Sequence, residues 1–310
     1  EFFHAWNVKR LRPKPLGPFD YSREVHTPSL WISEGLTSYY GDLLLVRAGL
    51  QKPERYLELL SRLITNFEQR PGRSERSIEE TSWDTWFRAG VTGDTNLANS
   101  TYSYYDGGQI AGHLLDFAIR QATNNQKSLD DWMRLLFQRH ALPKPAFEPE
   151  DAVRAANEVA GKDVSEIFRR YISGKEAIPY ETYFTYAGIH VERMRTPDVG
   201  WTGIVTSRDD DGRARVSNII PGSPAEDAGV DKNDVIIALD GRVMDQADFQ
   251  KSLDARRPGD KLRLAVLRRG DLKELSVTAV PYPYTTFKLQ VADNLSPMQR
   301  KIFESWIHGK

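Results

Sequence analysis

The sequence of 310 residues contains no cysteine, and this absence removes several classes of site at once. Disulfide bonds, thiolate nucleophiles and sulfur-ligated zinc sites all need cysteine, so His, Asp and Glu remain as candidate metal ligands. Long hydrophobic runs are also missing. The longest, such as 43–46 and 235–239, fall far short of the ~20 residues that a membrane-spanning helix needs. We therefore expect no membrane span in this chain, and the sequence leaves its compartment undecided.

Neither sign of charge is in excess. Lys and Arg together number 42, Asp and Glu number 43, and the formal net charge is −1. Without a basic surplus there is no overall field to attract nucleic acid or anionic lipid, so we expect no nucleic-acid partner. Hydrophobic residues make up 40% of the chain, which is typical of globular proteins. The length predicts two domains, because single cores seldom grow past about 250–300 residues.

The first part of the chain, residues 1–180, has the apolar spacing of a helical domain. Apolar residues recur at steps of three and four, as one buried face of a helix requires. Ser33 is the predicted N-cap of the first long helix, and no strand is predicted before about residue 183. Helices are predicted over residues 34–50, 56–67, 109–122, 129–140, 149–159 and 164–172.

After residue 179 the pattern changes to the alternation that is typical of strands, with a Gly-containing hairpin turn at 268–271. The run PGSPAEDAGVDKNDVIIALDG at 221–241 places Gly and Pro where successive turns require them. This part of the chain, about residues 183–282, resembles a PDZ domain. Asn233 stands where such domains usually carry Gly, and Asn tolerates the positive φ that the turn needs.

PDZ domains usually bind a peptide C-terminus by adding it as a strand, with a preceding loop accepting the carboxylate. The resemblance implies that this loop is GWTGI, and that residues 246–256 form the helix that flanks the groove. The loop departs from the usual Gly-Leu-Gly-Phe pattern, which leaves open that its Trp fills the pocket. The alternative is a module that packs against the chain or positions it. The candidate peptide-binding residues are Trp201, Thr202, Gly203 and Ile204.

The tail, residues 283–310, is predicted to end in a helix that begins with a capping box at Ser296 and Gln299. Ile302 and Trp306 lie on one face of this helix because they are four residues apart. We expect the helix to dock on its own chain. A helix that binds a partner protein would show the same pattern.

Two short segments carry candidate catalytic residues. Glu1 and His4 are three residues apart, which puts them on one face of a helix, and Glu34 lies at the start of a later helix in LWISEGLTSYY. In this order they resemble the gluzincin zinc metallopeptidases, whose motif is His-Glu-x-x-His followed by Glu on a later helix. The long insert between the segments, PFDY included, and the PDZ-like region resemble the glycyl aminopeptidase family.

This resemblance implies zinc as cofactor, with His4 and Glu34 as two ligands and Glu1 as the general base that takes a proton from the attacking water. Neutral imidazole and carboxylate suit zinc when thiolate is absent. The third ligand would be a His directly before Glu1. The chain therefore looks like a fragment that starts inside the motif, and we expect it to be inactive by itself.

The segment TYSYYDGGQIAGHLLDF resembles the family's Tyr-x-x-Gly segment, in which the Tyr hydroxyl stabilises the oxyanion of the tetrahedral intermediate. The matching residue is Tyr105, with Tyr104 as a second candidate, because the usual Lys of this segment is replaced by Gly107. The predicted fold is the α-helical C-terminal part of a gluzincin catalytic domain, a β-rich α/β PDZ domain and a terminal helix. The implied activity is removal of N-terminal Gly or Ala from a peptide substrate.

A second hypothesis is a non-catalytic scaffold whose PDZ module binds peptide C-termini or a partner protein. Glu34 would then be a carboxylate favoured by the dipole at a helix start, and Tyr105 would be ordinary aromatic packing. Isolated His residues in helical proteins are usually structural, and we assign His26 and His113 to that class. The order of the four candidate elements along the chain favours the peptidase.

Overall fold

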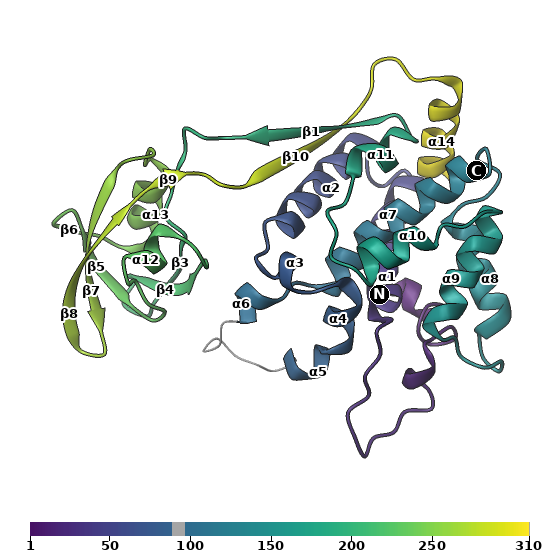
Figure 1. Cartoon of the computed structure of the whole chain (residues 1–310), viewed down its shortest axis with the longest axis horizontal. Coiled ribbons are helices and arrows are strands. Elements are labelled where there is room, and N and C mark those ends of the chain that lie inside the picture. The colour runs from purple at the N-terminus through teal and green to yellow at the C-terminus, as the bar shows by residue number, and fades with distance from the viewer. Residues whose placement is uncertain (89–96, 310) are drawn as a thin grey trace. The chain divides into compact units, whose positions relative to one another are not determined.

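The computed structural model describes residues 1–88 and 97–309, and they form two compact units (Figure 1). Among these residues the helical unit contains 1–88, 101–193 and 287–309, and the β-rich unit contains 97–100 and 194–286. Strands β1 (Ile189–Arg195) and β10 (Thr285–Val291) pair with each other where the chain passes from one unit to the other and back. The predicted order of a helical part, a β-rich part and a terminal helix is confirmed.

The helical unit consists of α-helices joined by short 3₁₀ helices and two π-helical turns. The 3₁₀ helices are η1 (Phe2–Ala5) and η2 (Lys14–Leu16), and the π-helical turns are η3 (Trp31–Gly35) and η4 (Phe168–Ile172). The α-helices are α1 (Leu36–Arg47), α2 (Pro53–Glu68), α3 (Gly72–Glu75), α4 (Ile78–Trp83), α5 (Thr85–Arg88), α7 (Tyr104–Ala122), α8 (Leu129–His140), α9 (Pro149–Ala160), α10 (Ser165–Ile167), α11 (Tyr180–Thr185) and α14 (Pro297–His308).

Besides the start of α2, which lies at Pro53 rather than at residue 56, two predicted helix starts were wrong. Ser33 does not cap a helix, because the chain is already helical there as part of η3, which leads directly into α1. Helix α7 begins at Tyr104 rather than at residue 109, and the Ser103 side chain caps it by accepting a hydrogen bond from the Tyr105 backbone N–H at 3.1 Å. Both errors arose because apolar periodicity marks the buried face of a helix and not its ends.

Helix α7 runs through the middle of the helical unit (Figure 1) and is buried from residue 107 to residue 120. Apolar and small side chains project from every side of this helix, as burial of a whole helix requires. Helix α14 packs into the same core through Ile302 and Trp306, which are fully buried. The Trp306 indole N–H donates to the Tyr39 hydroxyl at 3.1 Å, and that hydroxyl donates to the buried Asp116 carboxylate at 2.6 Å.

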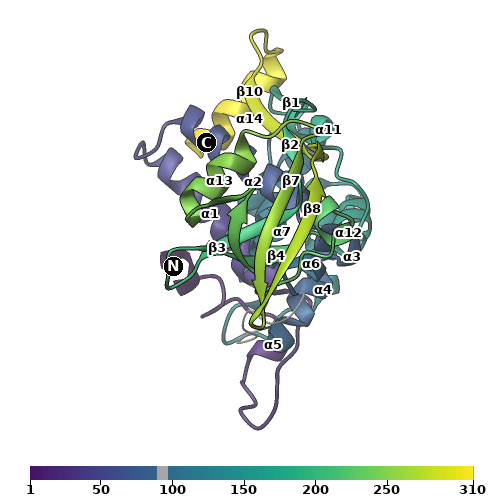
Figure 2. The same cartoon turned by 90° about the vertical axis from the view of Figure 1, so that its left-hand side faces the viewer.

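The β-rich unit is an antiparallel sheet in the order β3-β4-β5-β7-β8, with β6 paired to β5 and a small β2–β9 pair beside it. Figure 2 shows β7 and β8 running side by side, and residues 268 and 271 close their hairpin. Asn233 has φ 70°, as predicted for its turn. The elements are α6 (Leu97–Ser100), β2 (Gly200–Trp201), β3 (Ile204–Arg208), β4 (Ala214–Ile219), α12 (Pro224–Asp227), β5 (Val235–Leu239), β6 (Arg242–Val243), α13 (Gln246–Asp254), β7 (Lys261–Arg268), β8 (Asp271–Thr278) and β9 (Val280–Pro281).

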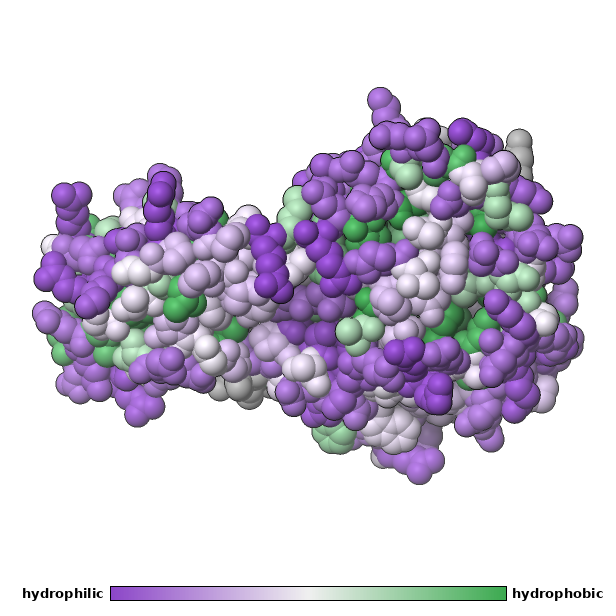
Figure 3. Space-filling view, turned by 45° about the horizontal axis from the view of Figure 1, so that its top comes forward, coloured by the Kyte–Doolittle hydropathy of each residue, from purple (hydrophilic) through white to green (hydrophobic). Residues whose placement is uncertain are grey.

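The face shown in Figure 3 is mainly hydrophilic, and its apolar areas are small and scattered among polar ones. Isolated apolar residues on a surface are normal and mark no interface by themselves. None of the helices in the described ranges combines the length and the hydropathy that crossing a bilayer requires.

Candidate active site

The candidate site forms where η3 crosses the first turns of α7, and two glycines make that crossing possible. A Cβ at Gly35 would lie 2.4 Å from the Gly108 Cα, and a Cβ at Gly108 would lie 2.5 Å from the Trp31 carbonyl oxygen. Real Cβ atoms do not approach backbone atoms so closely, so only glycine fits at either position. The crossing sets Glu34, the residue before Gly35, close to the start of α7.

His4 and Glu34 meet at the surface of this crossing. The His4 Nε2 atom lies 3.1 Å from the Glu34 Oε2 atom, and about a fifth of each side chain is exposed (21% and 22%). The other ring nitrogen, Nδ1, lies 3.1 Å from the Asn7 backbone carbonyl. A carbonyl oxygen can only accept, so Nδ1 carries a proton. The second ring nitrogen, Nε2, thus faces a carboxylate, and it can either donate a proton to that carboxylate or bind a cation together with it.

The pair fits two ligands of a single zinc ion. Tetrahedral zinc with bonds of about 2.0–2.2 Å to nitrogen and oxygen holds two such atoms roughly 3.4 Å apart. The observed separation is 3.1 Å. Zinc-bound His residues usually donate their second N–H to a carbonyl or carboxylate, as His4 does here. The described residues contain no group of three or more His, Asp or Glu side chains that converge on one point, so His4 and Glu34 would be two ligands of an incomplete set.

Tyr105 lies beside Glu34, on the first turn of α7, and 42% of its surface is exposed. Burial of its hydroxyl raises the pKa of Tyr105 well above the ordinary value, and the nearby Glu34 carboxylate, which accepts a hydrogen bond from that hydroxyl, raises it further. The Glu1 carboxylate acts in the same direction. The phenol therefore stays protonated and can donate. The second candidate, Tyr104, stacks on Tyr105 with ring centroids 5.0 Å apart.

Glu1 precedes η1, and its backbone carbonyl accepts a hydrogen bond from the His4 backbone N–H at 3.1 Å. Residues three apart in a 3₁₀ helix lie one above the other, so Glu1 and His4 share a face. The structure thus brings together the four residues that the sequence singled out, namely Glu1, His4, Glu34 and Tyr105. The catalytic and metal-binding roles assigned to them stay predictions.

The sequence analysis missed three residues that build this site. Gly35 and Gly108 permit the crossing, and the buried Asn7 joins the His4 segment to η3 through its side chain. The repeated Gly in the segment after Tyr105 was a signal for close helix packing. Asn7 carried no signal, because a polar residue in a short turn gives no indication of which distant backbone groups it will bind.

The other histidines singled out in the sequence have structural partners. His113 is fully buried, where its Nε2 lies 2.9 Å from the Tyr56 hydroxyl and its Nδ1 lies 2.8 Å from the Gln109 carbonyl. Burial lowers the pKa of His113 to about 4, so the ring is neutral at pH 7. His26 stacks on two aromatic rings of α4 and α5, and its Nδ1 lies 2.8 Å from a backbone carbonyl.

The predicted peptide-binding loop lies between β2 and β3 of the β-rich unit. Gly203 has φ 77°, and a Cβ there would lie 2.1 Å from the Ser223 Cβ, so the loop needs glycine. Trp201 packs edge-on against Tyr284, with ring centroids 5.7 Å apart. Thr202 is buried, and its hydroxyl accepts a long hydrogen bond, 3.4 Å, from the Ile204 backbone N–H. The Ile204 N–H of the loop therefore already has a partner within the chain and does not point freely to a ligand.

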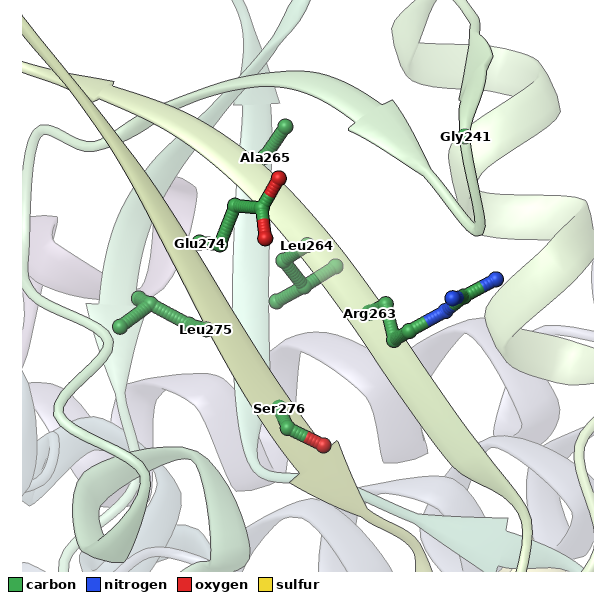
Figure 4. Close-up of a pocket in the computed structure, with 7 residues that line it drawn as sticks. All are labelled: Gly241, Arg263, Leu264, Ala265, Glu274, Leu275 and Ser276. Atoms are coloured by element: carbon green, nitrogen blue, oxygen red, sulfur yellow. The ribbon is translucent and has the colours of Figure 1, made fainter.

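Strand β3 ends the sheet order, so one of its edges has no strand partner among the described residues, and α13 packs beside it. A separate hollow of about 430 Å³ opens over β7 and β8 (Figure 4). Its lining includes Arg263, which points away from Glu274 in that view, and none of residues 201–204. The hollow is therefore distinct from the predicted peptide site.

Comparison with known families gives one match in the helical unit and one in the β-rich unit. Residues 1–111 match the sequence model of the M61 glycyl aminopeptidases, and residues 197–279 match that of the PDZ domain. This chain carries an M61 glycyl aminopeptidase region followed by a PDZ domain. The predicted family resemblance is thereby confirmed, and the M61 match supports a peptidase.

A solved structure extends the likeness over the PDZ domain and the tail. The crystal structure of an aminopeptidase N family protein from Idiomarina loihiensis matches 99% of this chain with a TM-score of 0.86 and 25% identity. The match covers 53% of that protein's chain, so this chain spans about half its length. The multidomain arrangement predicted from the sequence is therefore shared with an aminopeptidase-family protein.

Curated relatives match shorter stretches. A probable periplasmic serine endoprotease DegP-like protein from Chlamydia pneumoniae is 33% identical over 88 residues, which are 28% of this chain and 17% of that protein. The periplasmic pH-dependent serine endoprotease DegQ of Escherichia coli is 36% identical over 66 residues, 21% of this chain and 14% of that protein. The chain thus spans less than a fifth of the length of these relatives.

Proposed function

We propose that this chain provides the catalytic residues of a zinc-dependent aminopeptidase that removes N-terminal Gly or Ala from peptides. The observation that carries the proposal is the contact of His4 Nε2 with Glu34 Oε2 at 3.1 Å, while Nδ1 is held by the Asn7 carbonyl. That geometry leaves two electron-pair donors facing one point. The M61 match and the position of Tyr105 beside the same point support it.

His4 and Glu34 would hold the zinc ion, and a third protein ligand would complete the usual set for a catalytic site. Bound zinc would supply Lewis-acid activation of water and polarisation of the substrate carbonyl. Within the described part of the chain only two ligands converge, so we expect this chain to bind zinc weakly and to have no activity by itself.

Glu1 and Tyr105 have complementary proton roles in this proposal. The Glu1 carboxylate accepts the proton of the attacking water and passes it to the leaving amine. The Tyr105 hydroxyl donates a hydrogen bond to the oxygen on which negative charge develops, and this bond strengthens as the charge grows. The raised pKa of Tyr105 suits that role because the phenol stays protonated at neutral and mildly alkaline pH.

Zinc affinity tests the ligand set. We would compare the chain with a version that has one His added before Glu1, and with a control version that has one Gln added there. Each would be titrated with zinc in competition with a chromophoric chelator. The added His should give stoichiometric, tight zinc binding that Glu34→Gln then weakens, and the added Gln should give none. Tight stoichiometric zinc on the dialysed chain without the added His would contradict the two-ligand description.

Hydrolysis tests the reaction. The zinc-loaded chain with the added His should cleave the p-nitroanilides of Gly and Ala faster than that of Leu. The acetylated Ala substrate, which lacks a free amine, should not be cleaved by an aminopeptidase. If the protein binds zinc tightly but cleaves none of the substrates, the metal site stands and the proposed reaction is refuted. Equal cleavage of the acetylated substrate would refute the aminopeptidase assignment.

A second candidate function is capture of a peptide C-terminus by the PDZ domain. The open edge of β3 beside α13 is the feature that favours it, because PDZ domains add their ligand as a strand at such an edge. A library of peptides with free C-terminal carboxylates should contain binders, and amidation of the C-terminus should abolish their binding. If no member binds at high concentration, the module that only packs or positions the chain is favoured instead.

A further inference from the structure

Asn7 is a buried polar residue in the turn that follows η1, and it is 1% exposed. Its side-chain amide donates to the carbonyl of Ile32 at 2.8 Å and to that of Ser33 at 3.1 Å. The Thr37 hydroxyl lies 3.2 Å from the same nitrogen and donates to the Ser33 carbonyl at 2.7 Å. Both carbonyls belong to η3 and directly precede Glu34.

The π-helical turn η3 receives donors from outside the helix. A π-helical turn interrupts the regular i→i+4 ladder of backbone hydrogen bonds, and such turns are frequent at functional sites. Buried carbonyls at such an interruption gain from an additional donor. Asn7 supplies the amide hydrogens from a segment 25 residues away in sequence. Its side chain thus fixes the backbone that carries Glu34.

The backbone carbonyl of Asn7 contacts His4, the residue that faces Glu34. Its carbonyl oxygen lies 3.1 Å from His4 Nδ1, which fixes the ring orientation and keeps the proton on that nitrogen. One residue therefore holds His4 through its carbonyl and the Glu34 segment through its amide. The two contacts set where Nε2 and the carboxylate meet.

The local backbone is strained in a way that these contacts can maintain. Val8, the next residue, has φ 100°, a region that β-branched residues rarely occupy. The turn is closed by hydrogen bonds from the Asn7 N–H to the Phe3 carbonyl at 2.9 Å and from the Val8 N–H to the Leu11 carbonyl at 2.7 Å. Strained backbone persists where surrounding contacts over-determine it, and it clusters at functional sites.

The chemistry requires an amide at position 7. The Asn7 Oδ1 atom is buried and has no hydrogen-bond partner among the described residues, so the side chain works through its NH₂ group alone. An Asp of the same shape would replace the donor by a second acceptor, directed at two carbonyl oxygens. We propose that Asn7 is the positioning residue that sets His4 against Glu34, an inference that rests on the proposed metal site.

The first test measures which ring nitrogens of His4 are protonated in the metal-free full chain. Nitrogen-15 correlation spectra of His-labelled protein, about two units above the usual imidazole pKa, distinguish protonated from unprotonated ring nitrogens, and His4→Gln assigns the signals. Nδ1 of His4 should be protonated, also where Nε2 shares a proton with Glu34. Asn7→Asp should lower the protonation of Nδ1, because it disturbs the turn that holds the carbonyl of residue 7 against that nitrogen. The matched control is Asn157→Asp, which makes the same amide-to-carboxylate change on α9: Asn157 Oδ1 accepts from the Val164 N–H at 2.8 Å, and its side chain also donates to the Asp163 carboxylate.

The second test measures zinc affinity. It uses the chain with His added before Glu1, titrated with zinc alone. Loss of a group that orients a ligand typically weakens metal binding roughly 10- to 100-fold, and we expect this loss for Asn7→Asp. Asn157→Asp should bind as the parent does. If the parent binds no zinc, the proposed function fails, and the protonation of Nδ1 still decides the role of Asn7.

Two outcomes would overturn the inference. One is an Asn7→Asp variant that keeps the parental protonation of Nδ1 and the parental zinc affinity. The other is an equal change in Asn157→Asp, which would indicate general destabilisation. If Asn7→Asp does not fold, as judged by circular dichroism, Thr37→Val replaces it. This variant removes the hydroxyl shared by Asn7 and the Ser33 carbonyl, and it should change both readouts in the same direction. Parental values in Thr37→Val would then refute the inference.

Discussion

Replacing Gly108 by Ala should destabilise the helical unit, although alanine is the better helix former. A Cβ at Gly108 would lie 2.5 Å from the Trp31 carbonyl oxygen and 2.9 Å from the Gly35 Cα. Both neighbours are backbone atoms, which cannot turn aside as a flexible side chain can. The extra methyl group therefore has to push η3 away from α7, and Glu34 moves with η3.

The size of the effect follows from two opposing contributions. Overpacking a well-packed contact costs about 1–3 kcal/mol, and replacing Gly by Ala inside a helix contributes about 0.5–1 kcal/mol of stability. The net loss should be about 1–2 kcal/mol. Gly41, on an exposed part of α1, is the matched control because a Cβ there meets nothing within 4 Å. Gly41→Ala should therefore raise stability by about 0.5–1 kcal/mol.

Urea unfolding followed by tryptophan fluorescence measures both variants. The two free energies of unfolding should change in opposite directions, which removes any effect common to Gly-to-Ala substitutions. Zinc affinity of the chain with the added His should fall in Gly108→Ala and stay unchanged in Gly41→Ala. A Gly108→Ala protein as stable as Gly41→Ala would refute the backbone contact between η3 and α7, and with it the explanation of how Glu34 reaches the site.

Three further predictions concern single side chains. Because burial lowers the pKa of His113 to about 4 from 6.5, the unfolded chain takes up the proton first as the pH falls. Stability should be constant above about pH 7.5 and should fall by about 1.3 kcal/mol between pH 7.5 and 5.5. Urea unfolding should show no such loss in His113→Gln, and an equal loss would exclude His113 as its source. Tyr105→Phe should lower kcat of the zinc-loaded enzyme by about 10²–10³ with little change in zinc affinity, and unchanged turnover would remove Tyr105 from the mechanism. Trp306→Ala should cost about 3–5 kcal/mol in urea unfolding of the helical unit, and a loss below about 1 kcal/mol would mean that the tail helix is not part of that core.

Periodicity was sufficient to predict most of the helices. The predicted helix at 129–140 agrees with α8 at both ends, and the hairpin turn at 268–271 closes β7 and β8 as expected. These elements are set locally, since the Ser128 N-cap of α8 and a Gly-containing turn act within a few residues. The start of α7 was missed because Tyr104 and Tyr105 do not belong to its apolar stripe.

The catalytic candidates could be named from motif order, but not the way in which they come together. Glu1, His4 and Glu34 were identified because their order resembles the gluzincin motif. Their meeting depends on Gly35, Gly108 and the Asn7 amide, all of which act through backbone atoms of distant segments. Such contacts leave no periodic trace in the sequence. A motif can thus indicate which groups react, while the packing that aligns them has to be seen.

The tail shows a similar separation between local pattern and tertiary role. Its amphipathic stripe fitted docking on its own chain or binding to a partner, and nothing local distinguished the two. In the structure Ile302 and Trp306 fill the core around α7, and the Trp306 indole joins the Tyr39–Asp116 hydrogen bonds. Residues 287–309 therefore complete the helical unit, and the PDZ domain is inserted into that unit's sequence rather than appended to it. Because β1 and β10 pair where the insertion begins and ends, the helical core is closed by segments on both sides of the PDZ domain. The stability of the candidate site should consequently depend on the last helix of the chain as well as on the first residues.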